Sequence, residues 1–375
     1  MNRLTGLILL SGSSPSTTNI RYLSGFTAPD PFLYLQTAAG NYLIVSKMEK
    51  ERAVRQSKTG TCVYTPGELG LAGKKANDFG EQIRKVMELL GLRRVQVPKD
   101  FPAGLFQFLQ KKGVAVSIRG TPVCPERSIK SREEIALLRR SQRAAVAAMK
   151  AAVGLIESSR IDRQNRLLAG KIPLTSDAVR RRINQILIEH DCAGNDTIVA
   201  GGEQATDPHE RGEGPLHAGQ SIILDIFPRS EKSGYWGDIT RTVCRGPAPQ
   251  ELKKLYGAVR AAQTEALRAV KPGICADEVH KAAQAVFLQR GFETVEKDGK
   301  HIGFIHGTGH GVGLDIHERP RLGTSGETLE AGQVVTVEPG LYYPGLGGVR
   351  IEDTVVVTEA GFRYLATSPK KFELL

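Results

Sequence analysis

Acidic residues lie inside or at the ends of runs that otherwise read as buried β-strands, and this placement constrains the fold more than any other feature. Asp225 lies inside SIILDIF, and Asp238 opens the next strand-like run, GDITRTV. Glu338 follows the apolar part of QVVTVEPG, and Glu352 lies inside GVRIEDTVVVT. Because a buried carboxylate is costly unless it is paired or bound to a metal, the fold must bring compensating charge to several strands.

The first two acidic runs are joined by PRSEKSGYW, so we expect them to form a β-hairpin. An ion pair, for example with Arg241, would explain one buried aspartate. Asp225 and Asp238 facing each other would repel, and a cation between them explains the pair better.

The last acidic run is expected to form one continuous strand. Arg350 lies two residues before Glu352, and side chains two apart in a strand share a face. Asp353 then points the other way, and we interpret it as a turn or surface residue.

The stretch HGTGHGVGLDIHE, residues 306–318, holds three of the chain's eight histidines. Its glycines allow positive φ and close backbone approach, which favours a tight loop over a helix. Two Asp, two Glu and at least one His on adjoining strands fit two divalent ions sharing carboxylates. Such ligands suit Mn²⁺, with Co²⁺, Fe²⁺ and Zn²⁺ as alternatives, and the lack of a nearby cysteine argues against a structural zinc site.

The sequence pattern changes near residue 126, from short strand-like runs to a long helical run. Before it, strand-like runs (LTGLILL, FLYLQTAAGNYLIVS, GVAVSIRG) alternate with the helical GEQIRKVMELLGL, which predicts a small α/β domain, residues 1–126. After it, SREEIALLRRSQRAAVAAMKAAVG predicts a long helix that begins with a capping box of Ser131 and Glu134 and ends at Gly154.

The second predicted domain, residues 127–375, repeats one order of elements. The helix from Ser131 is followed by the helical TSDAVRRRINQILIEHDC, and a helix from Glu251 to about Val270 is followed by ADEVHKAAQAVFLQRGF. Each helix pair precedes a strand-rich stretch, which indicates a duplicated half-domain.

Composition excludes several partners. Fourteen Lys or Arg against six Asp or Glu lie between Arg127 and His190, but without interleaved aromatics or a known motif they favour a solvated helical face over a nucleic-acid site. No apolar run reaches the roughly 20 residues of a membrane span, and LILL is too short for a secretory signal. The five scattered cysteines, without a CxxC pair, indicate reduced thiols and a cytoplasmic protein.

The order LDIF…GYWGDITRT, HGTGHGVGLDIHE, TVEPGLYY, GVRIED resembles the pita-bread metallopeptidases, which include methionine aminopeptidase, aminopeptidase P and prolidase. NIRYLSGF is similar to the N-terminal domain of the aminopeptidase P, prolidase and creatinase branch. The resemblance implies an α+β chain with a pita-bread catalytic domain, an N-terminal α/β creatinase-like domain and a homodimeric assembly. It also implies two metal ions, with Asp238 and Glu352 bridging, held by Asp225, Asp238, His310, Glu338 and Glu352.

The resemblance also implies roles around the metals. Glu338 would carry a proton to the leaving nitrogen, and His317 would assist proton transfer and hold the scissile carbonyl. His209, in DPHERGEGP, would touch the substrate or the tetrahedral intermediate. For the pocket of the residue after the cut we propose His306, with Ile316 and Arg350 nearby; alternatively His306 only supports the glycine-rich loop.

One spacing departs from the family pattern. Asp238 follows Asp225 by thirteen residues rather than the commoner eleven, and the extra pair fits in the loop PRSEKS without shifting either strand. The departure puts the rim of the pocket in doubt rather than the ligands.

The resemblance implies an Xaa-Pro aminopeptidase, whose substrate is a peptide with proline at the second position. The alternative is an Xaa-Pro dipeptidase (prolidase). Methionine aminopeptidase lacks an N-terminal domain of this kind. A creatinase-like amidinohydrolase works without metal, and a non-catalytic binding member would have lost ligands that this chain keeps.

Overall fold

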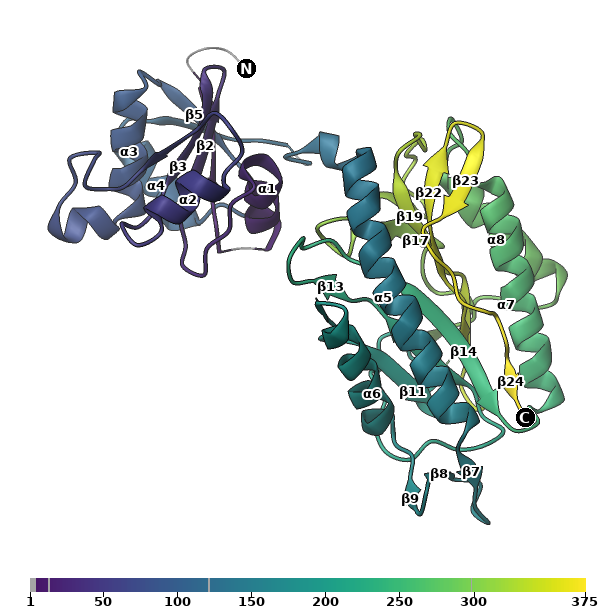
Figure 1. The fold of residues 1–375 in the computed structure, drawn as a ribbon. Coiled ribbons are helices and arrows are strands. Elements are labelled where there is room, and N and C mark those ends of the chain that lie inside the picture. The colour runs from purple at the N-terminus through teal and green to yellow at the C-terminus, as the bar shows by residue number, and fades with distance from the viewer. Residues whose placement is uncertain (1–4, 13, 121, 298) are drawn as a thin grey trace. The chain divides into compact units, whose positions relative to one another are not determined.

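The computed structural model describes residues 5–12, 14–120, 122–297 and 299–375, which form two compact units, Met1–Arg127 and Ser128–Leu375 (Figure 1). Each unit has its own hydrophobic core. They are described separately.

The N-terminal unit is a mixed sheet covered by helices. Its strand order is β4-β3-β2-β1-β5-β6, with β1–β2 and β2–β3 antiparallel and the other pairs parallel. Leu7 and Leu9 pack into one core cluster and Ile8 into another, so β1 is buried on both faces. The α/β prediction for this unit is confirmed. The bounds are β1 Thr5–Leu10, α1 Ser14–Ser24, β2 Leu33–Thr37, β3 Gly40–Ile44, α2 Lys50–Gln56, β4 Thr61–Tyr64, α3 Phe79–Leu89, β5 Arg94–Val97, α4 Ala103–Lys111 and β6 Ala115–Ile118.

The second unit is built around two larger sheets, each with its own pair of helices. One sheet has the order β11-β12-β14-β24, and the other has the order β18-β17-β19-β22-β23. Helices α5 and α6 share a core cluster with the first sheet, and α7 and α8 share one with the second (Figure 1). The predicted succession of helix pair and strands is therefore present twice. The bounds are α5 Arg132–Glu157, α6 Ser176–Glu189, β11 Ile198–Gly201, β12 Ile222–Ile226, β14 Ile239–Arg245, α7 Gln250–Ala269, α8 Ala276–Gln289, β17 Gly309–Gly311, β18 Glu318–Leu322, β19 Val334–Val337, β22 Asp353–Thr358, β23 Gly361–Tyr364 and β24 Glu373–Leu374.

Shorter elements connect the sheets of this unit. The hairpin of β20 and β21 leads from β19 to β22, and the 3-10 helix η3 follows β11. A small three-stranded sheet occupies the connection between α5 and α6. The bounds are β7 Arg160–Ile161, β8 Leu167–Ala169, β9 Ile172–Pro173, β10 Cys192–Ala193, η3 Gly202–Thr206, β13 Arg229–Ser230, β15 Val295–Lys297, β16 Lys300–Ile302, β20 Gly340–Tyr343 and β21 Gly347–Arg350.

Helix α5 confirms its predicted start and corrects its predicted end. The Ser131 side chain accepts a hydrogen bond from the Glu134 backbone, and Glu134 accepts one from the Ser131 backbone, which is the predicted capping box. The helix continues through Gly154 to Glu157, so the predicted end is wrong. Ala152 and Ile156 are buried four residues apart, and this packing keeps Gly154 helical.

The surroundings of Asp353 differ from the prediction. Asp353 is fully buried in β22 and accepts from Arg241 at 2.7 Å and from Lys370 at 2.7 Å. Arg241 therefore compensates Asp353 rather than Asp225 or Asp238. The predicted single strand is also interrupted, since β21 ends at Arg350 and β22 begins at Asp353.

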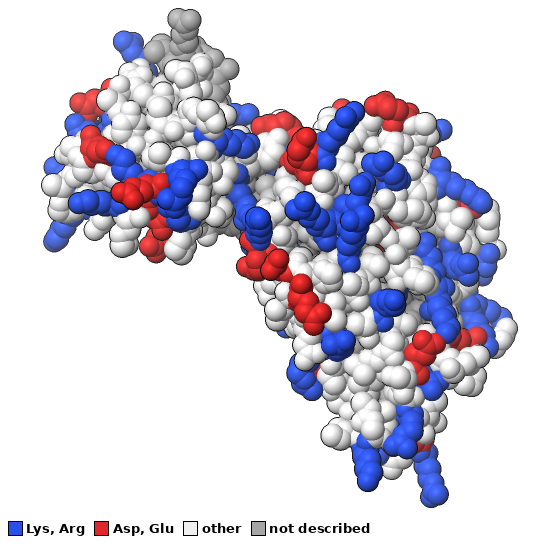
Figure 2. Space-filling model, in the orientation of Figure 1, with Lys and Arg blue, Asp and Glu red and all other residues white. Residues whose placement is uncertain are grey.

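The surface of the second unit carries mixed charge. On the face drawn in Figure 2, Lys and Arg side chains are interspersed with Asp and Glu. Among the described residues, no helix combines the length and the apolar character needed to cross a membrane.

Candidate metal centre

The five predicted metal ligands, four carboxylates and one histidine, lie on or next to strands of the two larger sheets of the second unit. Asp225 lies in β12, and Asp238 immediately precedes β14, which pairs antiparallel with β12 as the hairpin prediction required. His310 lies in β17, Glu338 immediately follows β19, and Glu352 lies between β21 and β22. The two sheets are joined here, because the Glu352 backbone donates to the Thr240 carbonyl at 3.0 Å.

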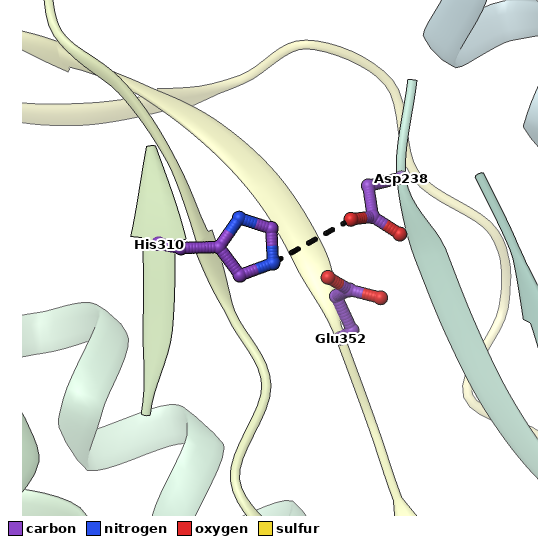
Figure 3. A group of neighbouring side chains, drawn as sticks. All are labelled: Asp238, His310 and Glu352. Atoms are coloured by element: carbon purple, nitrogen blue, oxygen red, sulfur yellow. Dashed lines mark ion pairs between the residues drawn. The ribbon is translucent and has the colours of Figure 1, made fainter. Parts of the chain in front are cut away.

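Three of the five side chains meet directly. Asp238, His310 and Glu352 each offer a ligand atom, and these atoms all lie within 4.8 Å of one another. Figure 3 shows the three side chains pointing toward a common space. They are only 4%, 8% and 2% exposed, so a charge placed among them is shielded from water.

The other two carboxylates adjoin this group. Glu338 Oε1 lies 3.1 Å from His310 Nε2 and accepts from the Thr336 hydroxyl at 3.1 Å. Asp225 Oδ2 accepts from the Arg350 guanidinium at 2.8 Å. Asp225 Oδ1 is buried and has no hydrogen-bond partner among the described residues. A buried carboxylate oxygen without a partner is costly, and a cation is the ligand that would satisfy it.

The carboxylates perturb one another. Burial and Asp225 raise the pKa of Asp238 well above its ordinary value, and burial and Asp238 do the same to the pKa of Glu352. Burial also opposes the ionised forms of Glu338 and His310. Their mutual attraction prevails, and it lowers the pKa of Glu338 to about 2 and raises the pKa of His310 to about 9. The cluster thus contains more carboxyl groups than its own cations can keep ionised, and a bound metal ion would supply the missing positive charge.

The tautomer of His310 also fits metal binding. Its Nδ1 lies 3.1 Å from the Gly311 carbonyl oxygen, which can only accept, so in the neutral ring Nδ1 carries the hydrogen. The lone pair is then on Nε2, the atom that faces Asp238 and Glu338. A metal-binding histidine commonly donates its other N–H to a carbonyl in this way. The donor set of carboxylates and one imidazole suits divalent Mn, Co, Fe or Zn.

His306 belongs to a hydrogen-bonded chain that includes Tyr342, a residue that the sequence did not single out. His306 Nδ1 lies 2.7 Å from the Gly307 carbonyl oxygen and Nε2 lies 2.9 Å from Tyr342 Oη. Tyr342 Oη accepts from Arg350 at 2.7 Å, and Arg350 holds Asp225. Burial lowers the pKa of His306, so the ring is neutral and accepts from the tyrosine. A tyrosine inside the apolar GLYY gave no sequence signal of this role.

The remaining predicted residues lie at the edge of the cluster. The ring centroids of His317 and His310 lie 4.4 Å apart in an edge-to-face arrangement. His317 is exposed at the surface, but partial desolvation of its ring and the charge of His310 lower its pKa to about 4. His209 is exposed after η3 and lies near enough to lower the pKa values of His306 and His317. Ile316 is partly buried in the same loop as His317, whereas Arg350 is buried at 3% exposure and occupied by Asp225 and Tyr342.

The longer connection between Asp225 and Asp238 packs on the glycine-rich loop. The Trp236 backbone donates to the Gly313 carbonyl at 3.0 Å, and its indole donates to the Leu314 carbonyl at 3.0 Å. The pairing of β12 with β14 runs unbroken from Ile222 to Ile226. The additional residues therefore lie outside the pairing of β12 with β14, although Arg229 and Ser230 in this connection pair with β10.

Comparisons with known proteins show which families and solved structures the chain is similar to. The family model of metallopeptidase family M24 matches residues 136–359, and that of the creatinase/prolidase N-terminal domain matches residues 2–120. The chain is 29% identical over 365 residues to an Xaa-Pro dipeptidase of Pyrococcus horikoshii, covering 94% of this chain and 91% of that protein. It is 34% identical over 250 residues to an Xaa-Pro dipeptidase of Pyrococcus furiosus, covering 65% of each. The solved structure of an Xaa-Pro dipeptidase from Bacillus anthracis superposes with a TM-score of 0.83 at 27% identity, covering 98% of this chain and 94% of that one.

Proposed function

Because the chain belongs to metallopeptidase family M24, we propose that it is an Xaa-Pro dipeptidase, which hydrolyses the bond between an N-terminal residue and a following proline. The fold prediction, a pita-bread catalytic unit with an N-terminal creatinase-like unit, is confirmed. The chain is a metallo-exopeptidase. Between the two predicted activities, the named relatives favour dipeptidase over Xaa-Pro aminopeptidase. The observation that carries the proposal is the buried carboxylate and imidazole cluster around Asp238.

The residues that would hold two divalent ions in this proposal are Asp225, Asp238, His310, Glu338 and Glu352. Bound there, the ions would lower the pKa of a water toward neutrality and polarise the scissile carbonyl. Two observations support this assignment: Asp225 Oδ1 has no hydrogen-bond partner among the described residues, and His310 Nε2 faces Asp238 and Glu338. Mn²⁺ is our proposed metal, because four of the five ligands are carboxylates.

Protons are moved by the chain's own residues. When water attacks the carbonyl carbon and the bond to the prolyl nitrogen breaks, that nitrogen must gain a proton, since as a tertiary amide nitrogen it carries none. Glu338, ionised at neutral pH, can accept the proton of the water and pass it to this nitrogen. His317 is neutral in this structure and can donate to the carbonyl oxygen as negative charge develops there. His209, near His317, is proposed to contact the same oxygen or the substrate.

Selectivity for proline is proposed to come from a pocket bordered by His306, with Ile316 beside the loop. The hydrogen bonds of His306 to Tyr342 and to the Gly307 carbonyl fix its ring. A fixed ring can shape the wall of a pocket for the proline ring. Arg350 was predicted to border this pocket, but its guanidinium is buried among Asp225 and Tyr342, so we propose that it supports the wall from behind.

Further proposals concern the setting of the enzyme. Each of the five cysteines, all in the described part of the chain, is a free thiol, which supports a cytoplasmic location. On the family resemblance we also propose that the protein forms a homodimer. On the change in sequence pattern near residue 126 we propose the domains 1–126 and 127–375.

The proposal is tested with a peptide panel. Xaa-Pro dipeptides, Xaa-Pro-Yaa tripeptides and Xaa-Ala dipeptides are assayed with added Mn²⁺ and with EDTA. We expect cleavage of Xaa-Pro dipeptides alone, abolished by EDTA. Tripeptides cut as well as dipeptides would assign the chain as an Xaa-Pro aminopeptidase. Equal cleavage of Xaa-Pro and Xaa-Ala would remove proline selectivity, and full activity in EDTA would remove the metal centre.

A further inference from the structure

The backbone N–H and C=O of Asp238 lie just outside the sheet, where no neighbouring strand of the described chain forms backbone hydrogen bonds with them. The pairing of β14 with β12 ends at Ile239 opposite Ile226, so Asp238 has no strand partner there. Asp238 is nevertheless buried, and an unsatisfied backbone N–H or C=O in such a place costs about as much as a lost hydrogen bond. Its backbone must therefore find partners elsewhere.

The side chain of Gln142 supplies both partners. Gln142 Nε2 donates to the Asp238 carbonyl at 2.8 Å, and the Asp238 backbone N–H donates to Gln142 Oε1 at 2.8 Å. The Thr354 hydroxyl donates to the same carbonyl at 2.7 Å. Gln142 lies in α5 and is 0% exposed, so water does not compete for its amide. The primary amide thus imitates the peptide of a missing strand.

Gly237 brings the helix close enough for this contact. A Cβ at position 237 would lie 2.6 Å from the backbone nitrogen of Gln142 and from the backbone carbonyl group of Ser141. Only glycine therefore fits next to α5 at this position. The same helix also fixes Tyr235, two residues before Gly237, because the Ser141 hydroxyl donates to the Tyr235 carbonyl at 2.8 Å and Tyr235 Oη donates to Glu134 at 2.6 Å.

From this geometry we propose that Gln142 is a positioning residue, whose amide fixes the peptide of Asp238 and thereby aims its carboxylate at the metals; the inference rests on the proposed metal centre. Within the described part of the chain the amide forms no hydrogen bond to His310 or Glu352, and its hydrogen bonds go to Asp238. Because Asp238 is the proposed bridging ligand, tilting its peptide would weaken both ion sites together. Loss of a group that orients a metal ligand typically lowers metal affinity by about 10–100-fold.

The test compares Gln142→Met with Ser141→Ala. The first removes both bonds to the Asp238 peptide at similar volume, whereas the second removes an equally buried bond from the same helix to the same loop but spares Asp238. Binding of Mn²⁺ is measured by calorimetry, and the visible spectrum of the Co²⁺-loaded protein reports ligand geometry. We expect Gln142→Met to weaken Mn²⁺ binding by about 10–100-fold and to change the Co²⁺ bands, with Ser141→Ala within about 3-fold of wild type.

Three outcomes are distinguishable. Equal Mn²⁺ affinity and equal Co²⁺ spectra of Gln142→Met and wild type would overturn the positioning role and leave the metal centre intact. Equal losses in both variants would overturn it as well, since a general loosening of α5 would then suffice. Wild-type protein that binds no metal would instead refute the proposed function. If Gln142→Met does not fold, Gln142→Asn, whose amide is too short to make both contacts, takes its place with the same expected loss.

Discussion

Replacing Asp238 with Asn should change the stability of the protein in opposite directions with and without metal. In the metal-free protein Asp238 is buried beside Asp225, Glu338 and Glu352, and burial and Asp225 raise its pKa, so its ionised form is disfavoured in the folded state. Asn has nearly the same shape and no charge. We therefore expect Asp238→Asn to stabilise the metal-free protein, by on the order of 1–3 kcal/mol, the cost typical of a buried polar group left uncompensated.

With metal bound, Asp238→Asn should destabilise the protein instead of stabilising it. A ligand at 100 times its Kd stabilises the folded state by about 2.7 kcal/mol per site, and for a unit of this size that corresponds to roughly 5–10 °C in Tm. The Asn variant should lose most of this increment, because it lacks the proposed bridging carboxylate. Thermal unfolding in EDTA and in saturating Mn²⁺ measures both effects. Asp196→Asn is the control, because Asp196 is exposed and should change Tm little in either condition.

The same reasoning fixes the pH dependence of the metal-free protein. Asp238 and Glu352 have folded pKa values above their unfolded values, so the folded state binds their protons more tightly. Their contribution is present at low pH and is lost as the pH rises from about 4 through the folded pKa values. Asp238→Asn should flatten this fall. A variant that is less stable than wild type in EDTA, with an unchanged pH slope, would refute the idea that the carboxylates are held together against repulsion.

Three other predictions concern the histidines and Tyr342. His310→Ala should lose metal, whereas His317→Ala should keep metal by calorimetry and lose kcat by about 10²–10⁴-fold; normal metal binding and turnover in both would contradict the assigned roles. His306→Ala should narrow the ratio of kcat/KM for Xaa-Pro over Xaa-Ala dipeptides, and an unchanged ratio would leave His306 as a support of the loop only. Tyr342→Phe should cost about 1.5–3 kcal/mol in denaturant unfolding, because it leaves a buried donor of Arg350 without its acceptor; a cost below about 0.5 kcal/mol would argue against the chain from His306 to Asp225.

The acidic residues could be located from the sequence because charge in an apolar run is unusual whatever the tertiary structure. The hairpin that carries Asp225 and Asp238 followed from the length and composition of its connection, and the capping box of α5 from local spacing alone. Such signals depend on neighbouring residues. The roles assigned to the histidines rest on a resemblance and stay predictions.

Other features depend on contacts between distant segments and gave no local signal. Arg241 could pair with several carboxylates, and only the approach of β22 selects Asp353. The break between Arg350 and Asp353 falls in a run whose alternation predicts one strand. Gln142 looks like any polar residue of an amphipathic helix, since its partner is 96 positions away.

Because its residues come from two sheets, the cluster can form only when the whole second unit has folded. Asp225 and Asp238 lie in or next to strands of one sheet, and His310 and Glu338 lie in or next to strands of the other, so neither half of the unit can assemble the cluster alone. Contacts so distant in sequence form late, after most of the chain entropy has been lost. A nascent or partly unfolded chain would therefore lack the proposed metal centre and would bind divalent ions only weakly.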